Sequence, residues 1–83
     1  MVAVFVMQGC SACHEYLPRL KRLVGGKIGL HVRDVGADPA LAAAYGIQAT
    51  PTTIIRGRSG AVVRRTGNLP DDAVRALLAR ATR

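Results

Sequence analysis

The sequence has no tryptophan, three other aromatic residues, two cysteines and five acidic residues among its 83. Two cysteines are too few for a small domain held together by a disulfide framework, so we expect them to do chemistry. So few aromatic side chains disfavour nucleic acid binding by base stacking. The N-terminal apolar run, Val2 to Val6, is too short to span a membrane, and no basic segment precedes it, which disfavours a signal peptide. We therefore expect a cytoplasmic protein that has no membrane partner.

Positive charge dominates the polar residues, with twelve Lys and Arg and a net charge of +7. These basic residues are scattered from Arg19 to Arg83. The scatter predicts a solvated basic surface that attracts acidic proteins, rather than a nucleic acid interface. The length fits one domain, residues 1–83, and a hydrophobic content of 49% argues against disorder. We expect this domain to be a monomer.

One short segment, Met7 to His14, contains both cysteines and lies where a strand ends and a helix begins. The run Val2 to Val6 before it is continuously apolar, which predicts a buried central strand. After it, apolar residues recur at helical spacing. They predict a helix over about residues 11 to 24, with Pro18 inside it and Gly25-Gly26 at its end.

The start of that helix gives the cysteine pair its chemistry. Free backbone N–H groups and the positive end of the helix dipole stabilise an anion there, so a cysteine ionises more readily. The thiolate is the nucleophile in thiol–disulfide exchange. Cys13 lies on the same helical face as Cys10, one turn deeper. We predict that Cys10, at the exposed tip, attacks a disulfide and that Cys13 resolves the mixed disulfide.

The remaining sequence predicts a second strand and helix, then a hairpin and a last helix. The second strand is the alternating run Ile28 to Val35, with Val32 on its apolar side, and the second helix starts at Asp38-Pro39 and stops at Gly46. The hairpin consists of the strands Thr52 to Arg56 and Ala61 to Thr66. The last helix starts at Pro70 to Asp72. The residues expected to face the core are Leu41, Ala44 and Tyr45 in the second helix, and Val74, Leu77, Leu78 and Ala81 in the last. The first two strands are expected to be parallel, joined by a right-handed crossover.

A lone pair of cysteines at this spacing is ambiguous, because a redox pair, half of a zinc site and chance all fit. Four zinc ligands would need both histidines. His14 adjoins Cys13, and His31 lies on a strand without a partner at ligand spacing, so we expect no metal. On its helix His14 is expected to face solvent, where its charge would favour the Cys10 thiolate; the alternative is a general base.

The stretch Ala49 to Thr53 is the second informative segment. A proline at the first residue of a strand, here Pro51, is compatible with backbone pairing, and a trans bond there would only mark the strand start. The alternative is a cis-proline turn that places a backbone edge beside the cysteines, where it would pair with an extended substrate.

Taken in order, these segments resemble the thioredoxin superfamily over nearly the whole chain. Cys10-Ser11-Ala12-Cys13 followed by Pro18 is similar to the thioredoxin active-site helix with its internal proline. The other matching segments are Asp38-Pro39 through Tyr45-Gly46-Ile47 to Thr50-Pro51-Thr52, the hairpin turn Arg58-Ser59-Gly60, and the glycine loop Thr66-Gly67-Asn68-Leu69.

The resemblance implies an α/β, thioredoxin-like fold with elements in the order β-α-β-α-β-β-α. Its four-stranded mixed sheet would have the strand order 2-1-3-4 and be flanked by three helices. The resemblance also implies a cis bond before Pro51 and a redox-active disulfide, with no bound cofactor and no metal. The implied roles are catalytic for Cys10 and Cys13, substrate-binding for Gly9, Thr50, Pro51 and Gly67, and modulating for Ser11, Ala12 and His14.

Several residues depart from the thioredoxin pattern. The chain starts at the catalytic strand, as glutaredoxins do. Gly9 stands where thioredoxins have tryptophan, and Ser11-Ala12 replaces Gly-Pro. The buried acid of the thioredoxin catalytic strand would fall at Val4. We therefore expect that proton relay to be absent, with water or another group deprotonating Cys13.

Three functions follow from the resemblance and the charge. The leading hypothesis is a thioredoxin-like protein disulfide reductase, regenerated by thioredoxin reductase with NADPH and serving disulfide-bearing clients such as ribonucleotide reductase. The alternative is a glutaredoxin-type protein that draws electrons from glutathione. Glutaredoxins usually have two adjacent glycines, where this chain has only Gly67. Asp71 or Asp72 would have to hold the glutathione amino group. A glutaredoxin-sized protein served by thioredoxin reductase would combine the two. The third function is a non-catalytic binding module that uses the basic surface.

Overall fold

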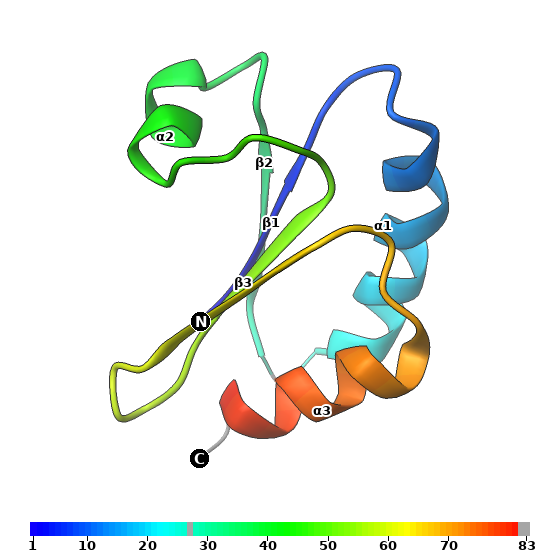
Figure 1. Ribbon diagram of the computed structural model, residues 1–83. Helices are drawn as coiled ribbons and strands as arrows, with labels where there is room; N and C mark the ends of the chain where they lie inside the picture. The colour runs from blue at the N-terminus through cyan, green and yellow to red at the C-terminus, as the bar shows by residue number, and fades with distance from the viewer. Residues whose placement is uncertain (27, 82–83) are drawn as a thin grey trace.

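The computed structural model describes residues 1–26 and 28–81 of the 83-residue chain. Its elements are β1 (Val2–Val6), α1 (Ser11–Val24), β2 (Leu30–Asp34), α2 (Pro39–Ala44), β3 (Thr52–Arg56), β4 (Val62–Thr66) and α3 (Asp71–Ala81) (Figure 1). This order confirms the predicted β-α-β-α-β-β-α arrangement. The predicted single domain also includes residues 27, 82 and 83, which lie outside the described residues. Within the described part of the chain, no helix combines the length and the apolar character that a membrane crossing needs.

β1 is an inner strand with a partner on each side. The strand order is β2-β1-β3-β4, with β1 parallel to β2 and antiparallel to β3, and with β3 antiparallel to β4. The predicted mixed sheet of order 2-1-3-4 is therefore confirmed. Parallel neighbours need a crossover between them, and α1 provides it.

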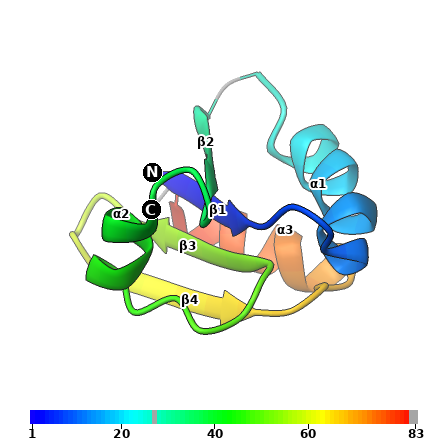
Figure 2. The same ribbon diagram turned by 90° about the horizontal axis from the view of Figure 1, so that it is seen from above.

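Helices cover both faces of the sheet, which explains the continuous apolar sequence of β1. α1 and α3 lie on one face and α2 on the other (Figures 1 and 2). Because neighbouring residues of a strand point to opposite faces, Val4 packs beneath α1 and α3, whereas Phe5 packs against α2. The larger buried cluster consists of Val2, Val4, Tyr16, Leu20, Val24, Ile55, Val74 and Leu77, and the smaller one of Phe5, Ala42 and Ile54.

The helix starts follow the chemistry expected from the sequence. The Asp38 carboxylate accepts a hydrogen bond from the Leu41 N–H at 3.2 Å, and Pro39 occupies the first position of α2. Asp71 and Asp72 lie in the first turn of α3, where the helix dipole favours acids.

Some details differ from the sequence prediction. β2 covers only part of the expected Ile28 to Val35, and β4 starts at Val62 rather than Ala61. Val32 is 37% exposed because β2 is an edge strand with fewer neighbours to cover it. In α2 the buried residue is Ala42. Ala44, expected in the core, is exposed because it lies two residues beyond the buried Ala42, at the end of a six-residue helix, and side chains two residues apart do not share a helix face.

One polar pair is sealed inside the larger cluster. The Tyr16 hydroxyl and the Thr53 Oγ1 form a hydrogen bond of 2.7 Å, and the two residues are 0% and 1% exposed. Thr53 is paired with Val4 across the β1–β3 ladder. Burial raises the pKa of Tyr16 because a phenolate would be poorly solvated there, so the hydroxyl remains protonated. The pair ties the middle of α1 to the centre of the sheet.

Removing the Tyr16 hydroxyl should destabilise the fold. In a Tyr16→Phe variant the buried Thr53 hydroxyl loses its partner, and a loss of this kind costs about 1–3 kcal/mol. We expect the free energy of unfolding, measured by urea titration, to fall by that amount. Thr53→Val should cost a similar amount, whereas the double variant Tyr16→Phe/Thr53→Val should cost less than the sum. Strict additivity of the two single losses would show that the hydroxyls do not interact.

Candidate active site

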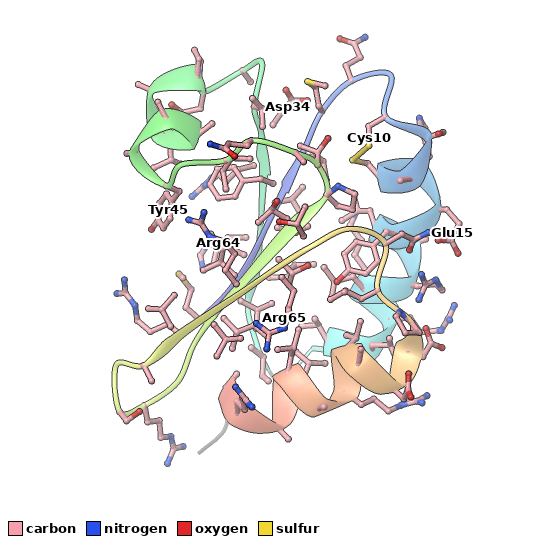
Figure 3. The ribbon with its side chains drawn as sticks, viewed as in Figure 1. Cys10, Glu15, Asp34, Tyr45, Arg64 and Arg65 are labelled. Carbon is pink, nitrogen blue, oxygen red and sulfur yellow. A yellow bond between two sulfur atoms is a disulfide. The ribbon has the colours of Figure 1, made fainter. Side chains whose placement is uncertain are left out.

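The two cysteines lie at the N-terminal end of α1 and form a disulfide (Figure 3). Cys10 is the N-cap of the helix and has an extended backbone, and Cys13 lies in the first turn. Their Cα atoms are 5.2 Å apart, within the range that a disulfide bridges. Gly9 makes the turn from β1 into the helix with a φ of +81°, a conformation that other residues rarely adopt. The strand–turn–helix junction thus brings both sulfur atoms to the tip of α1.

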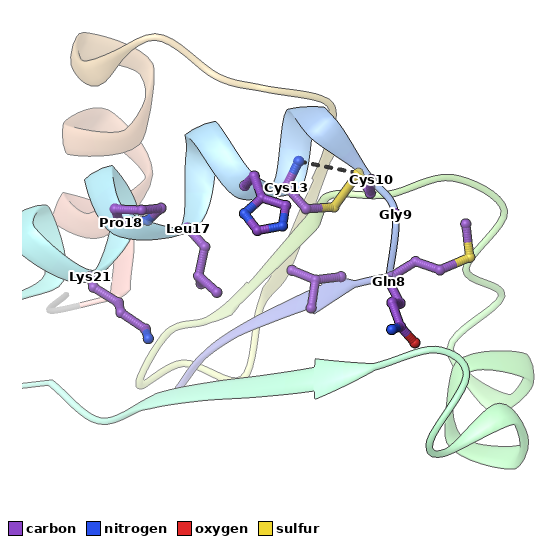
Figure 4. Close-up of a pocket in the computed structure, with 10 residues that line it drawn as sticks. Gln8, Gly9, Cys10, Cys13, Leu17, Pro18 and Lys21 are labelled. Carbon is purple, nitrogen blue, oxygen red and sulfur yellow. Dashed lines mark hydrogen bonds between the residues drawn. A yellow bond between two sulfur atoms is a disulfide. The ribbon is translucent and has the colours of Figure 1, made fainter.

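The two sulfur atoms have different surroundings. Cys10 is half-buried, and its Sγ accepts a hydrogen bond from the Cys13 N–H at 3.1 Å (Figure 4). Cys13 is only 5% exposed. After reduction, the same N–H and the helix dipole would stabilise a thiolate on Cys10. The Cys10 sulfur is therefore both the more accessible of the two and the one whose thiolate the helix stabilises. This difference fits the prediction that Cys10 attacks and Cys13 resolves.

Two loops form a connected backbone edge beside Cys10. The carbonyl oxygen of Thr50 is 3.7 Å from the Cys10 Sγ, close enough to accept a hydrogen bond from a reduced thiol. The Thr50–Pro51 peptide bond is cis. The Pro51 carbonyl oxygen accepts a hydrogen bond from the Gly67 N–H at 2.8 Å, which joins the proline loop to the glycine loop. The structure therefore brings together Thr50, Pro51 and Gly67, three of the four residues expected to bind substrate, and the fourth, Gly9, directly precedes Cys10.

The residues expected to modulate the pair lie in different environments. Ser11 and His14 are exposed, and Ala12 is half-buried. His14 lines a hollow next to Cys13. Val4, at which the resemblance would place the buried acid of thioredoxins, is fully buried. In residues 1–26 and 28–81, no group of three His, Cys, Asp or Glu side chains is arranged to hold a metal ion.

A cluster around Arg19, which the sequence reasoning missed, braces the glycine loop. The guanidinium donates to the carboxylates of Asp71 at 2.6 Å and Glu15 at 2.9 Å, and also to the amide oxygen of Asn68. Asn68 in turn donates to Glu15. The guanidinium also lies over the Tyr16 ring, 5.6 Å from its centroid. These contacts fasten the glycine loop and the start of α3 to α1.

Only part of this cluster is visible in the sequence. Glu15 and Arg19 are four residues apart, a spacing typical of ion pairs on a helix, but Asp71 is 52 residues from Arg19. The hydrogen bonds from Arg19 and Asn68 hold the pKa of Glu15 below its usual 4.5. The same bonds to Glu15 and Asp71 raise the pKa of Arg19, which stays charged. Asp71, one of the two acids considered for holding glutathione, is therefore already paired.

Comparison with solved structures identifies this architecture. Thioredoxin 1 of Thermosipho africanus superimposes with a TM-score of 0.83 at 25% sequence identity, over 95% of this chain and 90% of that one. Chloroplastic thioredoxin z gives a TM-score of 0.83 at 21% identity, over 96% of this chain and 75% of that one. The chain has the thioredoxin-like fold.

The thioredoxin-like fold is also shared with the Malassezia sympodialis thioredoxin Mala s 13. That structure has a TM-score of 0.78 and 23% identity, over 98% of this chain and 74% of that one. No protein-family model and no curated protein sequence matches the chain. A Cys-x-x-Cys pair at disulfide distance on the thioredoxin-like fold supports a disulfide oxidoreductase.

The lowered pKa of Glu15 predicts a contribution to stability that acid removes. A carboxylate with a lower pKa in the folded chain stabilises the fold above its unfolded value, near 4.5. That contribution disappears as the pH falls through the lower, folded value. We expect urea titrations to show Glu15→Gln less stable than wild type at pH 7, with the gap closing below pH 4.5. In an Arg19→Gln background the gap at pH 7 should shrink, and a gap of unchanged size would contradict the role given to Arg19.

Proposed function

We propose that this protein is a thioredoxin-like protein disulfide reductase. The observation that carries the proposal is the position of Cys10 and Cys13 at the tip of α1, beside the backbone edge of Thr50, Pro51 and Gly67. Disulfide exchange with a protein client needs a thiolate stabilised at an accessible place and a backbone edge that can hold an extended chain. Both features meet at this end of the sheet.

The proposed reaction begins with the reduced protein. The Cys10 thiolate attacks one sulfur of the client disulfide, a bond forms between the two, and the other client sulfur leaves as a thiolate that takes up a proton. Cys13, once deprotonated, then attacks the Cys10 Sγ and expels the remaining client thiolate. The client gains two electrons and two protons, and the protein is left with the Cys10–Cys13 disulfide that the structure contains.

Water is the proposed acceptor of the Cys13 proton. Val4 offers no carboxylate, and Tyr16 is held as a neutral hydroxyl against Thr53. Cys13 lines the hollow at which His14 lies, and we propose that water reaches the Cys13 thiol from that side. His14 could accept the proton from such a water, which would give it the modulating role predicted from its position in the sequence.

For regeneration we propose thioredoxin reductase with NADPH. This choice rests on the similarity to solved thioredoxins and on the pairing of Asp71 with Arg19, which removes one of the two acids available to glutathione. Asp72 is exposed and is the residue on which a glutathione-dependent activity would depend. We also propose a cytoplasmic location and disulfide-bearing clients such as ribonucleotide reductase, in line with a chain whose only cysteines form the redox pair.

Cysteine variants test the roles of the two thiols. Insulin reduction with dithiothreitol as electron donor should fall to the uncatalysed rate in Cys10→Ser, because the attacking thiol is lost. Cys13→Ser should lose the dithiol turnover, and when the reduced variant is mixed with insulin without dithiothreitol it should accumulate a covalent mixed disulfide with the client, because no second thiol resolves it. Mass spectrometry without reductant measures that adduct. A Cys10→Ser variant that still reduces insulin would contradict this assignment. So would a mixed disulfide that forms on Cys13 of the Cys10→Ser variant while the Cys13→Ser variant forms none on Cys10.

The Cys10→Ser variant also distinguishes a catalytic protein from a purely structural one. A non-catalytic binding module needs the fold and the basic surface but not the thiols. Full biological activity of Cys10→Ser would therefore support the module and contradict the reductase.

The electron donor can be identified with two coupled assays. NADPH is supplied either with thioredoxin reductase or with glutathione and glutathione reductase, and its oxidation is followed in the presence of insulin. We expect sustained turnover with the first couple and only slow turnover with the second. Faster turnover with glutathione that Asp72→Asn abolishes would instead establish the glutaredoxin-type activity.

A further inference from the structure

A hollow of about 320 Å³ opens between α1 and the end of β1, next to the cysteine pair (Figure 4). Val6, Leu17 and Pro18 supply apolar walls, and Cys13 borders it. Figure 4 shows Leu17 extending from α1 toward the end of β1. Of the four residues expected to bind substrate, Gly9 lines this hollow, whereas Thr50, Pro51 and Gly67 do not. The hollow therefore lies on the other side of the cysteine pair from the backbone edge of the proline and glycine loops.

Two basic side chains lie at the same hollow. His14 and Lys21 are seven residues apart, two turns of α1, so they share the helix face that also presents Leu17 and Pro18. Both are exposed. The ion pairs formed among residues 1–26 and 28–81 both belong to Arg19, which leaves His14 and Lys21 available for an outside partner.

All five acidic residues lie in the part of the chain that the structure describes, and none of them lines the hollow. Each makes its contacts elsewhere in the fold. Glu15 and Asp71 bind Arg19, and Asp34, Asp38 and Asp72 accept hydrogen bonds from the backbone N–H groups of Gly36, Leu41 and Ala73. An apolar wall with the unpaired ammonium group of Lys21 at its edge, and the His14 ring as a further hydrogen-bonding group, complements a ligand that has an apolar group next to a carboxylate.

We propose that this hollow is a second client subsite, which takes an apolar side chain and a neighbouring carboxylate from an acidic polypeptide whose cysteine reacts with Cys10. The inference rests on the proposed reductase function and adds a substrate class to it. The hollow begins at the cysteine pair itself, so a client chain held in a mixed disulfide must place residues close to it. A polypeptide is favoured for this reason, because its reacting cysteine brings the flanking residues with it.

The length of α1 sets which client residues are concerned. Lys21 lies roughly 16 Å along the helix from Cys10. An extended client chain covers that distance in about four to five residues. Leu17 lies roughly 10 Å along the helix from Cys10, a distance that about three extended residues cover. The subsite should therefore accept an apolar residue about three positions from the client cysteine and an acid about five positions from it.

Synthetic peptide disulfides test this reading. Disulfide-linked peptide homodimers carry leucine three positions and glutamate five positions from the cysteine, on its N-terminal or its C-terminal side in separate peptides. Matched peptides replace the glutamate by glutamine or lysine, or the leucine by serine. The second-order rate constant of reduction is measured in a single turnover of the dithiol protein. With the two residues on one of the two sides of the cysteine, we expect the glutamate peptide to react about tenfold faster than the glutamine peptide. The peptide in which serine replaces leucine should lose part of this rate advantage.

A matched pair of protein variants separates the subsite from the overall charge. Lys21→Glu and Arg22→Glu change the net charge equally and lie side by side on α1, but Arg22 does not line the hollow. Lys21→Glu should abolish the preference for the glutamate peptide, whereas Arg22→Glu should retain most of it. Equal effects of the two substitutions, or no preference in the wild type for either orientation, would overturn the subsite.

The glutamine peptide and insulin show which proposal has failed. If the wild type reduces both but shows no preference among the peptides, the reductase function stands and the subsite is wrong. If it reduces neither, the proposed function itself is wrong.

Discussion

The burial of β1 on both faces is the constraint from which the candidate active site follows. Val2 and Val4 point into the cluster that holds α1 through Tyr16 and Leu20, which fixes the helix against the strand and therefore fixes the position of its tip. Phe5, on the opposite face, anchors α2. The chain that leaves α2 runs to the proline loop and into β3, the other neighbour of β1. Alternate residues of one strand thus position the two sides of the site.

The loops at the site are fastened by contacts that converge on the same strand. The Gly67 N–H binds the Pro51 carbonyl, so the glycine loop cannot move away from the proline loop without losing a backbone hydrogen bond. Arg19 holds the glycine loop from the other side through Asn68. Tyr16, beneath Arg19, is bonded to Thr53, whose strand partner is Val4. The cysteine pair therefore lies on a frame in which each part is tied to β1 either directly or through a short series of contacts.

The sequence allowed most of the fold to be predicted because its patterns are local. Each signal can be recognised within a few residues: the apolar run of β1, the cap at Asp38 and the two cysteines. The resemblance to the thioredoxin superfamily then supplied the order of the strands in the sheet. The exposure of Val32 and Ala44 could not be read in this way, since it depends on which strand lies at the edge and where a short helix ends.

The same distinction applies to the candidate site. Cys10, Cys13 and the proline loop were found from spacing and resemblance, and the structure brings them together. The Arg19 cluster was missed because its partners come from distant parts of the chain. The hollow was missed for a related reason: the helical spacing of His14, Leu17 and Lys21 is visible in the sequence, but the wall that Val6 adds comes from a strand, and no pattern joins the two.

Net charge alone does not explain how such a basic protein could select a partner. A charge of +7 raises the rate of encounter with any acidic molecule and favours no particular orientation. Some of the basic side chains are also paired. Arg64, which lies beside Tyr45 in Figure 3, donates to the carbonyl oxygens of Tyr45 and Gly46. Arg19 binds two acids. Orientation requires a place where unpaired positive charge meets apolar surface within reach of the reacting sulfur. All five acids make contacts elsewhere in the fold, so no carboxylate neutralises Lys21 at the hollow beside Cys13. At this place, electrostatic attraction can also orient a bound client.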